Sequence, residues 1–130
     1  MGRYALGVLV LLCSSACGGS PTTPSVVGQW GGDHASLSVT EQSAHVELDC
    51  AHGDASTAIR TNTFAVPGTF VREHGGPIRD GETPDSHPAM FSGTVSGDSL
   101  TLTIRLTDTN EPIGTFALTR DSPGRVVKCL

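Results

Sequence analysis

The chain has 130 residues, with 13 Asp and Glu against 8 Lys and Arg and a formal net charge of −5 at pH 7. This length allows a single domain. The acidic balance excludes nucleic acid as a partner, because nucleic-acid binding depends on clustered lysine and arginine. It also gives the protein no electrostatic attraction to anionic lipid surfaces.

Residues 1–16 have the layout of a bacterial signal peptide. Arg3 supplies a positive charge, residues 5–12 (ALGVLVLL) are apolar, and the small residues 14–16 (SSA) precede Cys17. The apolar run is too short to cross a bilayer as a permanent helix. We therefore expect residues 1–16 to be removed during export.

Cys17 and the residues that follow it resemble the lipobox and tether of bacterial lipoproteins. Residues 17–25 read CGGSPTTPS, a linker of Gly, Ser, Pro and Thr. In that family the cysteine becomes the acylated N-terminus, so the resemblance implies a protein anchored to the bacterial cell envelope through acyl chains on Cys17, in the periplasm or on the outer-membrane face. Ser14 stands where such proteins usually carry leucine. The alternative is cleavage after Ala16 and a secreted, soluble protein.

From residue 26 onward, apolar and polar residues alternate between turn residues, which is typical of short antiparallel strands. Residues 51–54 are expected to form a turn. Residues 73–87, rich in Gly, Pro and charge, are expected to form a long loop that is either functional or mobile. Pro67 has no amide proton, so its strand should be bulged or kinked there or lie at an edge. We expect strands at 33–40, 44–50, 63–72, 88–95, 100–107 and 113–120, with a weak strand at 57–60 and a short one at 125–129.

These seven or eight strands, joined by hairpins, predict an all-β single domain over residues 26–130. The expected architecture is a small antiparallel up-and-down β-barrel, because closure removes both edge strands. An open β-sandwich of the same strands is the alternative. If Cys17 carries lipid, Cys50 and Cys129 remain as an even pair in an oxidising compartment, which predicts a disulfide between them. Two separate buried thiols are the alternative to this bridge.

The motifs of the chain do not specify a reaction or a cofactor. It has no G-x-S-x-G elbow, phosphate loop, CxxC pair or Rossmann fingerprint. We interpret His34, His45 and Glu47 as the polar outer face of a sheet. A zinc or copper site would arise if the turns that carry His52, His74 and His87 met at one barrel mouth, although no HxH or HxxxH pair is present. We therefore expect a protein that is not an enzyme and carries no cofactor, with metal binding as an alternative.

Gly28-Gln29-Trp30 resembles the GxW motif in the first strand of calycin-type barrels, which include lipocalins, avidins and small periplasmic metalloprotease inhibitors. In those barrels the tryptophan closes one end against an arginine near the last strand. Here Arg120 or Arg125 could take that part through cation–π stacking. The inhibitors are eight-stranded periplasmic domains with one disulfide, so an inhibitor-like barrel is an alternative function. They insert a free N-terminus into the enzyme, which acylation of Cys17 would prevent.

A wider resemblance covers most of the mature domain. WGGDH at residues 30–34, DCAHG at residues 49–53 and the final CL at residues 129–130 are similar to stretches in a group of uncharacterised bacterial secreted or lipid-anchored proteins. This resemblance implies a compartment and a fold but no activity. The sequence thus predicts a lipid-anchored, non-catalytic binding module for a partner protein or a small apolar ligand. If the barrel interior were solid, the small ligand would be ruled out, and protein interaction or inhibition would remain.

Overall fold

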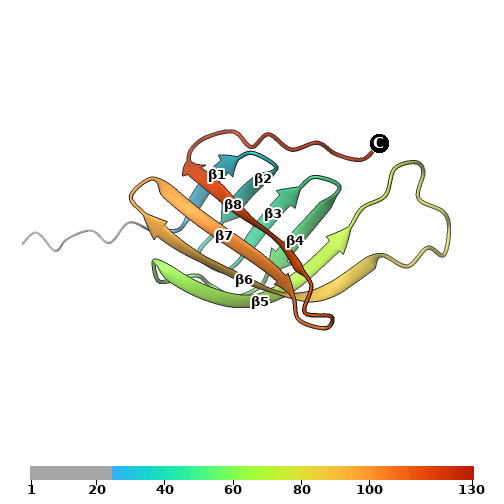
Figure 1. Ribbon diagram of the computed structural model, residues 1–130, viewed down its shortest axis with the longest axis horizontal. Coiled ribbons are helices and arrows are strands. Elements are labelled where there is room, and N and C mark those ends of the chain that lie inside the picture. Colours follow the sequence, from blue (N-terminus) through green and yellow to red (C-terminus); the bar gives the residue numbers. More distant parts are fainter. Residues whose placement is uncertain (1–24) are drawn as a thin grey trace, which may run out of the picture.

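The computed structural model describes residues 25–130, which form a closed antiparallel β-barrel (Figure 1). The strands follow one another around the barrel in sequence order, so the up-and-down barrel is confirmed and the open sandwich is excluded. The expected signal peptide and residues 17–24 of the expected tether lie outside the described residues. The strands are β1 Gly28–Gly32, β2 Ala35–Val39, β3 Ala44–Leu48, β4 Ala51–Ala55, β5 Thr63–Arg72, β6 Asp85–Ser96, β7 Ser99–Leu106 and β8 Pro112–Arg120.

The strands form because their apolar residues recur at every second position, which sends one set of side chains to the same face of a sheet. In β7 the set is Leu100, Leu102, Ile104 and Leu106, and each of these is at most 1% exposed. The intervening residues of β7 point outward, and Thr103 donates or accepts a hydrogen bond with Thr115 of β8 (3.1 Å). Each strand therefore contributes one row to the core and one row to the surface.

Side chains fill the interior of the barrel. Trp30, Leu102, Ile104 and Val46 are among the largest fully buried ones. The cavity that remains among the core side chains has a volume of about 10 Å³ and an apolar lining. This is about the space of one water molecule, and ligand pockets are larger by more than an order of magnitude. An eight-stranded barrel either is filled by its own side chains or holds one small ligand. The small cavity shows that this interior is solid.

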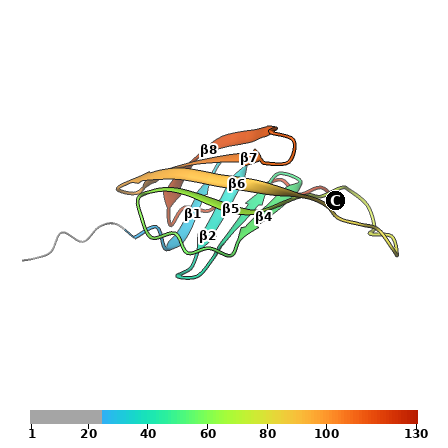
Figure 2. The same ribbon diagram turned by 90° about the horizontal axis from the view of Figure 1, so that it is seen from below.

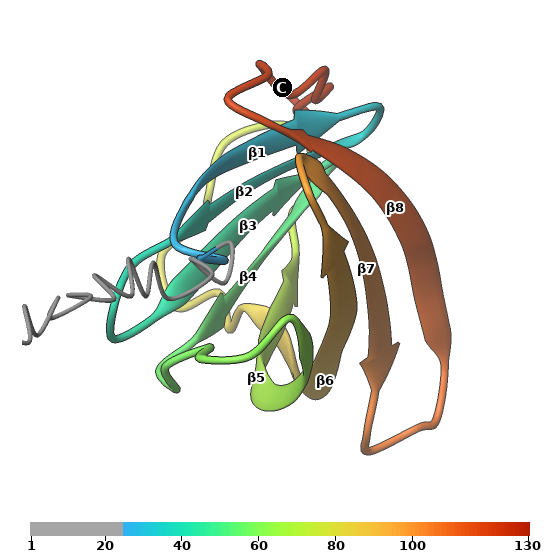
Figure 3. The ribbon, with the colours of Figure 1, turned by 90° about the vertical axis from the view of Figure 1, so that its left-hand side faces the viewer.

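The barrel has a short-stranded half and a long-stranded half. Strands β1 to β4 have 5 residues each, whereas β5 to β8 have between 8 and 12. The long strands therefore extend past the ends of the short ones, as Figures 2 and 3 show. Closure between β1 and β8 is brief: Trp30 lies opposite Arg120 and Gly31 opposite Thr119. Residues 112–116 of β8 continue beyond this seam.

Two sequence-based expectations about β4 and its neighbourhood are wrong. Residues 51–54 form most of β4, and the chain reverses one position earlier, where Cys50 adopts a left-handed conformation (φ 50°). Gly53 suggests a turn in the sequence, but its role is packing, because a Cβ there would lie 2.8 Å from the ring of Phe91. Residues 57–60 form no strand; that segment instead places Ile59, 7% exposed, in the core.

Three further expectations are refined. Residues 125–129 form no strand and contribute one parallel bridge, between Asp33 and Arg125. The long loop ends at residue 84, because β6 starts at Asp85. Pro67 lies in the part of β5 that pairs with β6 in unbroken register but not with β4, so it is at a local edge rather than at a bulge.

Candidate functional site

Trp30 closes one end of the barrel. Its ring is 1% exposed, and its Nε1–H donates a hydrogen bond to the carbonyl oxygen of Val26 (2.8 Å). The guanidinium carbon of Arg120 lies 4.2 Å from the centre of the Trp30 ring. Arg120 also donates to the carbonyl oxygen of Ser25 (2.8 Å), where the described chain begins. Of the two arginines considered from the sequence, Arg120 therefore stacks on Trp30, whereas Arg125 forms an ion pair with Asp33.

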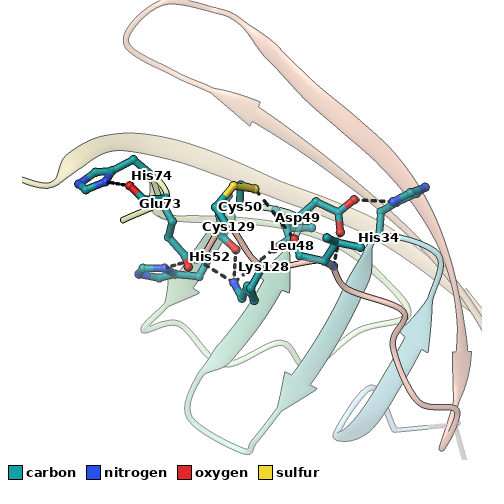
Figure 4. Close-up of a disulfide and its surroundings, with 12 residues drawn as sticks. His34, Leu48, Asp49, Cys50, His52, Glu73, His74, Lys128 and Cys129 are labelled. Carbon is teal, nitrogen blue, oxygen red and sulfur yellow. Dashed lines mark hydrogen bonds and ion pairs between the residues drawn. A yellow bond between two sulfur atoms is a disulfide. The ribbon is translucent and has the colours of Figure 1, made fainter. Parts of the chain in front are cut away.

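The last ten residues, 121–130, run across the outside of the barrel toward the opposite end, and we call them the C-terminal strap. Backbone hydrogen bonds fasten the strap to β1 and to the turn after it, from Arg125 N to Gly32 O (2.9 Å) and from His34 N to Arg125 O (2.9 Å). The expected disulfide fastens its end, because Cys50 and Cys129 are bonded with their Cα atoms 4.9 Å apart (Figure 4).

Lys128 anchors the strap on the outer face of β3 and β4. Its Nζ donates to the carbonyl oxygens of Leu48 (3.2 Å) and Ala51 (2.9 Å), which flank the turn that carries Cys50. The same Nζ pairs with the carboxylate of Glu73, as Figure 4 shows, and with that of Glu47. Hydrogen bonds to these carboxylates raise the pKa of Lys128 above its usual value despite the opposing effect of partial burial. Lys128 is therefore a structural cation of the strap.

On this face the pKa of His45 is raised, and the pKa values of Glu47 and Glu73 are lowered. Partial burial lowers the pKa of His45, but hydrogen bonds to Asp54 (2.6 Å) and Glu47 (2.7 Å) outweigh it, so the pKa of His45 lies above its usual value. Burial raises the pKa of Glu47, but Lys128 and His45 outweigh it, so this pKa is lowered. The hydrogen bond from Lys128 likewise lowers the pKa of Glu73. The cluster is thus most stable with the imidazole of His45 protonated and the acids ionised.

The histidines do not converge on one point. Each of the 5 histidines in the chain has a carboxylate partner of its own: His34 with Asp49, His45 with Glu47 and Asp54, His52 with Glu73, His74 with Glu82, and His87 with Asp85 and Asp108. His52, His74 and His87 therefore do not meet at a barrel mouth. Within residues 25–130 no group of three or more His, Cys, Asp or Glu side chains is arranged to hold a metal ion.

These pairs predict maximal stability at mildly acidic pH. The pKa of His87 is raised, chiefly by Asp108, and that of Asp49 is lowered, chiefly by the backbone N–H of Val127. The stability that such histidines contribute is fully present below pH 6.5, the ordinary pKa of histidine. It is lost as the pH rises through their raised pKa values. Stability from the carboxylates is complete above 3.8 for Asp and 4.5 for Glu and is lost as pH falls through their lowered values.

We therefore expect Tm, measured by circular dichroism, to be highest between about pH 4.5 and about pH 6.5. At about pH 8.5 Tm should be lower than at this maximum. The double variant His45→Gln/His87→Gln should show a smaller fall on the alkaline side, because two of the raised groups are gone. A Tm that stays constant or rises from about pH 5.5 to about pH 8.5 would contradict this assignment.

A groove of about 460 Å³ lies on the outer surface where β1, β8 and the strap meet, and we call it the β1–β8 groove. Gly31 and Gly32 of β1 line it together with Thr115 and Thr119 of β8 and Pro123 of the strap. Its volume is within the range of known binding pockets, which are about 300 to about 1,000 Å³. A hollow of about 540 Å³ also lies within the long loop, but loop residues alone line it. The β1–β8 groove is the candidate binding site of this domain, because strands of the barrel build it and the barrel interior has no comparable space.

The two glycines of β1 make the groove. A Cβ on Gly31 would lie 2.2 Å from the carbonyl oxygen of Ser122, so the strap can cross β1 only where there is no side chain. A Cβ on Gly32 would lie 2.2 Å from the carbonyl oxygen of Ala117, so β8 approaches β1 equally closely. Beyond Gly32, β1 ends and β8 does not, and the groove opens there. Gly31 and Gly32 therefore set how closely the strap and β8 approach β1.

Sequence reasoning missed both the groove and the part played by Lys128. One signal was available for each: Gly31-Gly32 directly follows Trp30 in a chain that otherwise alternates, and Lys128 directly precedes Cys129. A residue beside a bridged cysteine must lie close to the partner cysteine, in this case the β3–β4 turn. The crossing of the strap over β1 has no signal in the sequence, because it depends on the path of residues 121–125.

Comparison with known proteins adds no family to this chain, since it matches no family model, no curated protein and no solved structure. The resemblances to uncharacterised envelope proteins and to calycin-type barrels therefore stay predictions. Residues 25–130 include no helix of the length and apolar character needed to cross a membrane.

Proposed function

We propose that this protein is a lipid-anchored, non-catalytic binding module of the bacterial cell envelope that holds a partner protein on the outside of its barrel. The observation that carries the proposal is the contrast between the barrel interior and the groove that the strands and the strap build on its outside. The core cavity of about 10 Å³ admits no ligand, whereas the β1–β8 groove has about 460 Å³. The small apolar ligand considered from the sequence has no room inside, so the partner is a protein.

The arrangement of the polar residues supports a role without catalysis. His45, Glu47 and Lys128 pair with one another on the outer face of β3 and β4, away from the groove. A general acid or base must reach a substrate held in a cleft. Arg125 and His34, which do line the groove, are each paired with a carboxylate of this chain. The groove therefore offers shape and backbone groups rather than a reactive side chain.

The position of the anchor supports access to the groove. Cys17 begins the tether, residues 17–25, and the last residue of the tether, Ser25, lies at the Trp30 end of the barrel. The C-terminus, next to the bridged Cys129, and the loop of residues 73–84 lie toward the other end, as Figure 1 shows. The groove opens past Gly32, on the side of β1 that leads away from Ser25. An acyl anchor on Cys17 would therefore leave the groove facing away from the membrane.

A photo-crosslinking experiment in cells tests the binding role. A photoreactive amino acid placed at Thr119, an exposed residue of the groove, is expected to give a discrete adduct with one protein. The matched control is Thr69, an exposed threonine on β5 across the barrel, which should give none. Absence of an adduct at Thr119, or the same adduct from both positions, would refute a partner in the groove.

Mass spectrometry of the same membrane preparations tests the anchor. We expect a mature N-terminus at Cys17 that carries acyl chains, and we expect Cys17→Ser to leave an unprocessed, unacylated chain. An unmodified chain that begins at Cys17 in the soluble fraction would contradict the anchor. That result would favour the inhibitor-like alternative, which needs a free N-terminus.

A further inference from the structure

Over half of its length, the outer edge of β8 has no strand paired with it. On one side β8 pairs with β7 along nearly its whole length, from Ser99 opposite Thr119 to Arg105 opposite Pro112. On the other side it pairs with β1 only at Arg120 and Thr119. Within the described part of the chain, therefore, no strand is paired with residues 112–116 on that side. Exposed strand edges are templates for pairing with another chain.

The backbone groups at this edge can be assigned to single residues. The carbonyl oxygen of Ala117 points toward β1, since a Cβ on Gly32 would lie 2.2 Å from it. In a β-strand, residues two positions apart direct their N–H and C=O groups to the same edge. Thr115 therefore presents both its N–H and its C=O at the free edge, just past the end of β1. Phe116 and Leu118 direct theirs to β7, opposite Leu102 and Leu100.

The surroundings of this edge define what fits beside it. Thr115 lines the β1–β8 groove, and Phe116, which is half-buried and packs against the core, lies at the same place. Residues 112–117 (PIGTFA) carry no charge. On the rim of the groove the charges of Asp33 and Arg125 neutralise each other, and His34 is hydrogen-bonded to Asp49. An extended, uncharged segment with an apolar side chain beside Phe116 matches these features.

We propose that the groove binds an extended segment of a partner protein as an additional β-strand, hydrogen-bonded to the backbone of Thr115. This inference rests on the proposed function and names the mode of recognition. It follows the known mode of peptide binding in which backbone hydrogen bonds supply affinity and alternate side chains supply specificity.

A second copy of this chain fits the edge less well than a partner segment. Two β8 edges related by a two-fold axis would pair antiparallel, which turns the two barrels in opposite directions. Their Ser25 ends would then point in opposite directions, whereas the tethers of two anchored copies must run to the same membrane. The occupant is therefore a segment of another protein.

Panning a phage-displayed library of random peptides on the detergent-solubilised full chain tests the inference. Enriched peptides are synthesised, and their Kd is measured by fluorescence anisotropy for the wild type, Thr115→Pro and Thr103→Ala. Thr115→Pro removes the edge N–H and its hydroxyl bond to Thr103, whereas Thr103→Ala removes that bond and keeps the edge. We expect binding to weaken by about tenfold or more in Thr115→Pro and to stay unchanged in Thr103→Ala.

Amide hydrogen exchange supplies a readout that does not depend on a variant that folds. Bound peptide should slow exchange of the Thr115 amide in the wild type and leave the Leu118 amide unchanged, because Leu118 already faces β7. The inference is overturned if no peptide is enriched, if Thr115→Pro binds as tightly as the wild type, or if Thr115 gains no protection. It is also overturned if sedimentation by analytical ultracentrifugation shows that the wild type is a dimer and Thr115→Pro is a monomer, since the edge would then bind a second copy.

The two levels of proposal fail in different ways. An adduct at Thr119, together with peptides whose Kd is unchanged by Thr115→Pro, would support the binding module and reject strand addition. Absence of any adduct at Thr119 in cells would reject the proposed function itself, whatever peptides the edge can bind in solution.

Discussion

Replacing Cys50 and Cys129 together by serine is expected to lower the free energy of unfolding by about 4 kcal/mol. The bridge closes a loop with a sequence separation of 79 residues, and a crosslink stabilises mainly by restricting the unfolded chain. Such a loss is a large share of the about 5 to about 15 kcal/mol typical of a domain. Urea unfolding followed by circular dichroism measures it.

Two controls separate the bridge from the contacts of the strap. Wild-type protein unfolded in the presence of a reductant should match the double-serine variant, because both lack the crosslink. Arg125→Ala, which removes the exposed pair with Asp33 at the other end of the strap, should have a far smaller effect, because exposed ion pairs contribute little. A double-serine variant within about 1 kcal/mol of the wild type would mean that native strap contacts, not the crosslink, hold the C-terminus.

Trp30→Ala is expected to destabilise the barrel by about 3 to about 5 kcal/mol. The substitution leaves a cavity at the Trp30 end, where the ring is 1% exposed, and it removes the surface on which Arg120 stacks. It also leaves the carbonyl oxygen of Val26 without its donor. Because the chain has a single tryptophan, unfolding must be followed by circular dichroism rather than by intrinsic fluorescence.

Trp30→Phe is the matched control for the cavity. Phenylalanine keeps an aromatic ring beneath Arg120 and loses the Nε1–H bond to Val26, so we expect a loss of about 1 to about 2 kcal/mol. If Trp30→Ala and Trp30→Phe were equally destabilised, the hydrogen bond rather than the ring would be the main contribution. That result would refute the account of Trp30 as the residue that fills this end.

The strands that the sequence predicted best are those whose burial follows from local alternation. In β7, and again in β2 and β3, each apolar residue of the pattern is buried, because a period of two admits only one face toward the core. Gly53 misled the same reasoning. Glycine favours turns in general, but here its missing side chain makes room for Phe91, which comes from β6. A contact between such distant residues leaves no local signal.

In the candidate site, too, features with a local sequence signal were predicted and features that depend on distant contacts were not. The sequence indicated a disulfide from cysteine parity and a stacked Trp–Arg pair from the GxW resemblance. It did not indicate the β1–β8 groove, because that groove arises from unequal strand lengths and from the path of the strap over Gly31. The edge at Thr115 is free only because β1 ends at Gly32. The sequence of β8 carries no signal for where β1 ends.

By itself, the sequence determined an all-β chain, its alternating core rows and the pairing of Cys50 with Cys129, since each follows from local periodicity or from counting. Only the tertiary structure decided that the interior is solid and that a groove lies outside, between β1, β8 and the strap. The physical reason is that both properties depend on how residues far apart in the chain approach one another. Those approaches are set by glycines whose neighbours in space are not their neighbours in sequence.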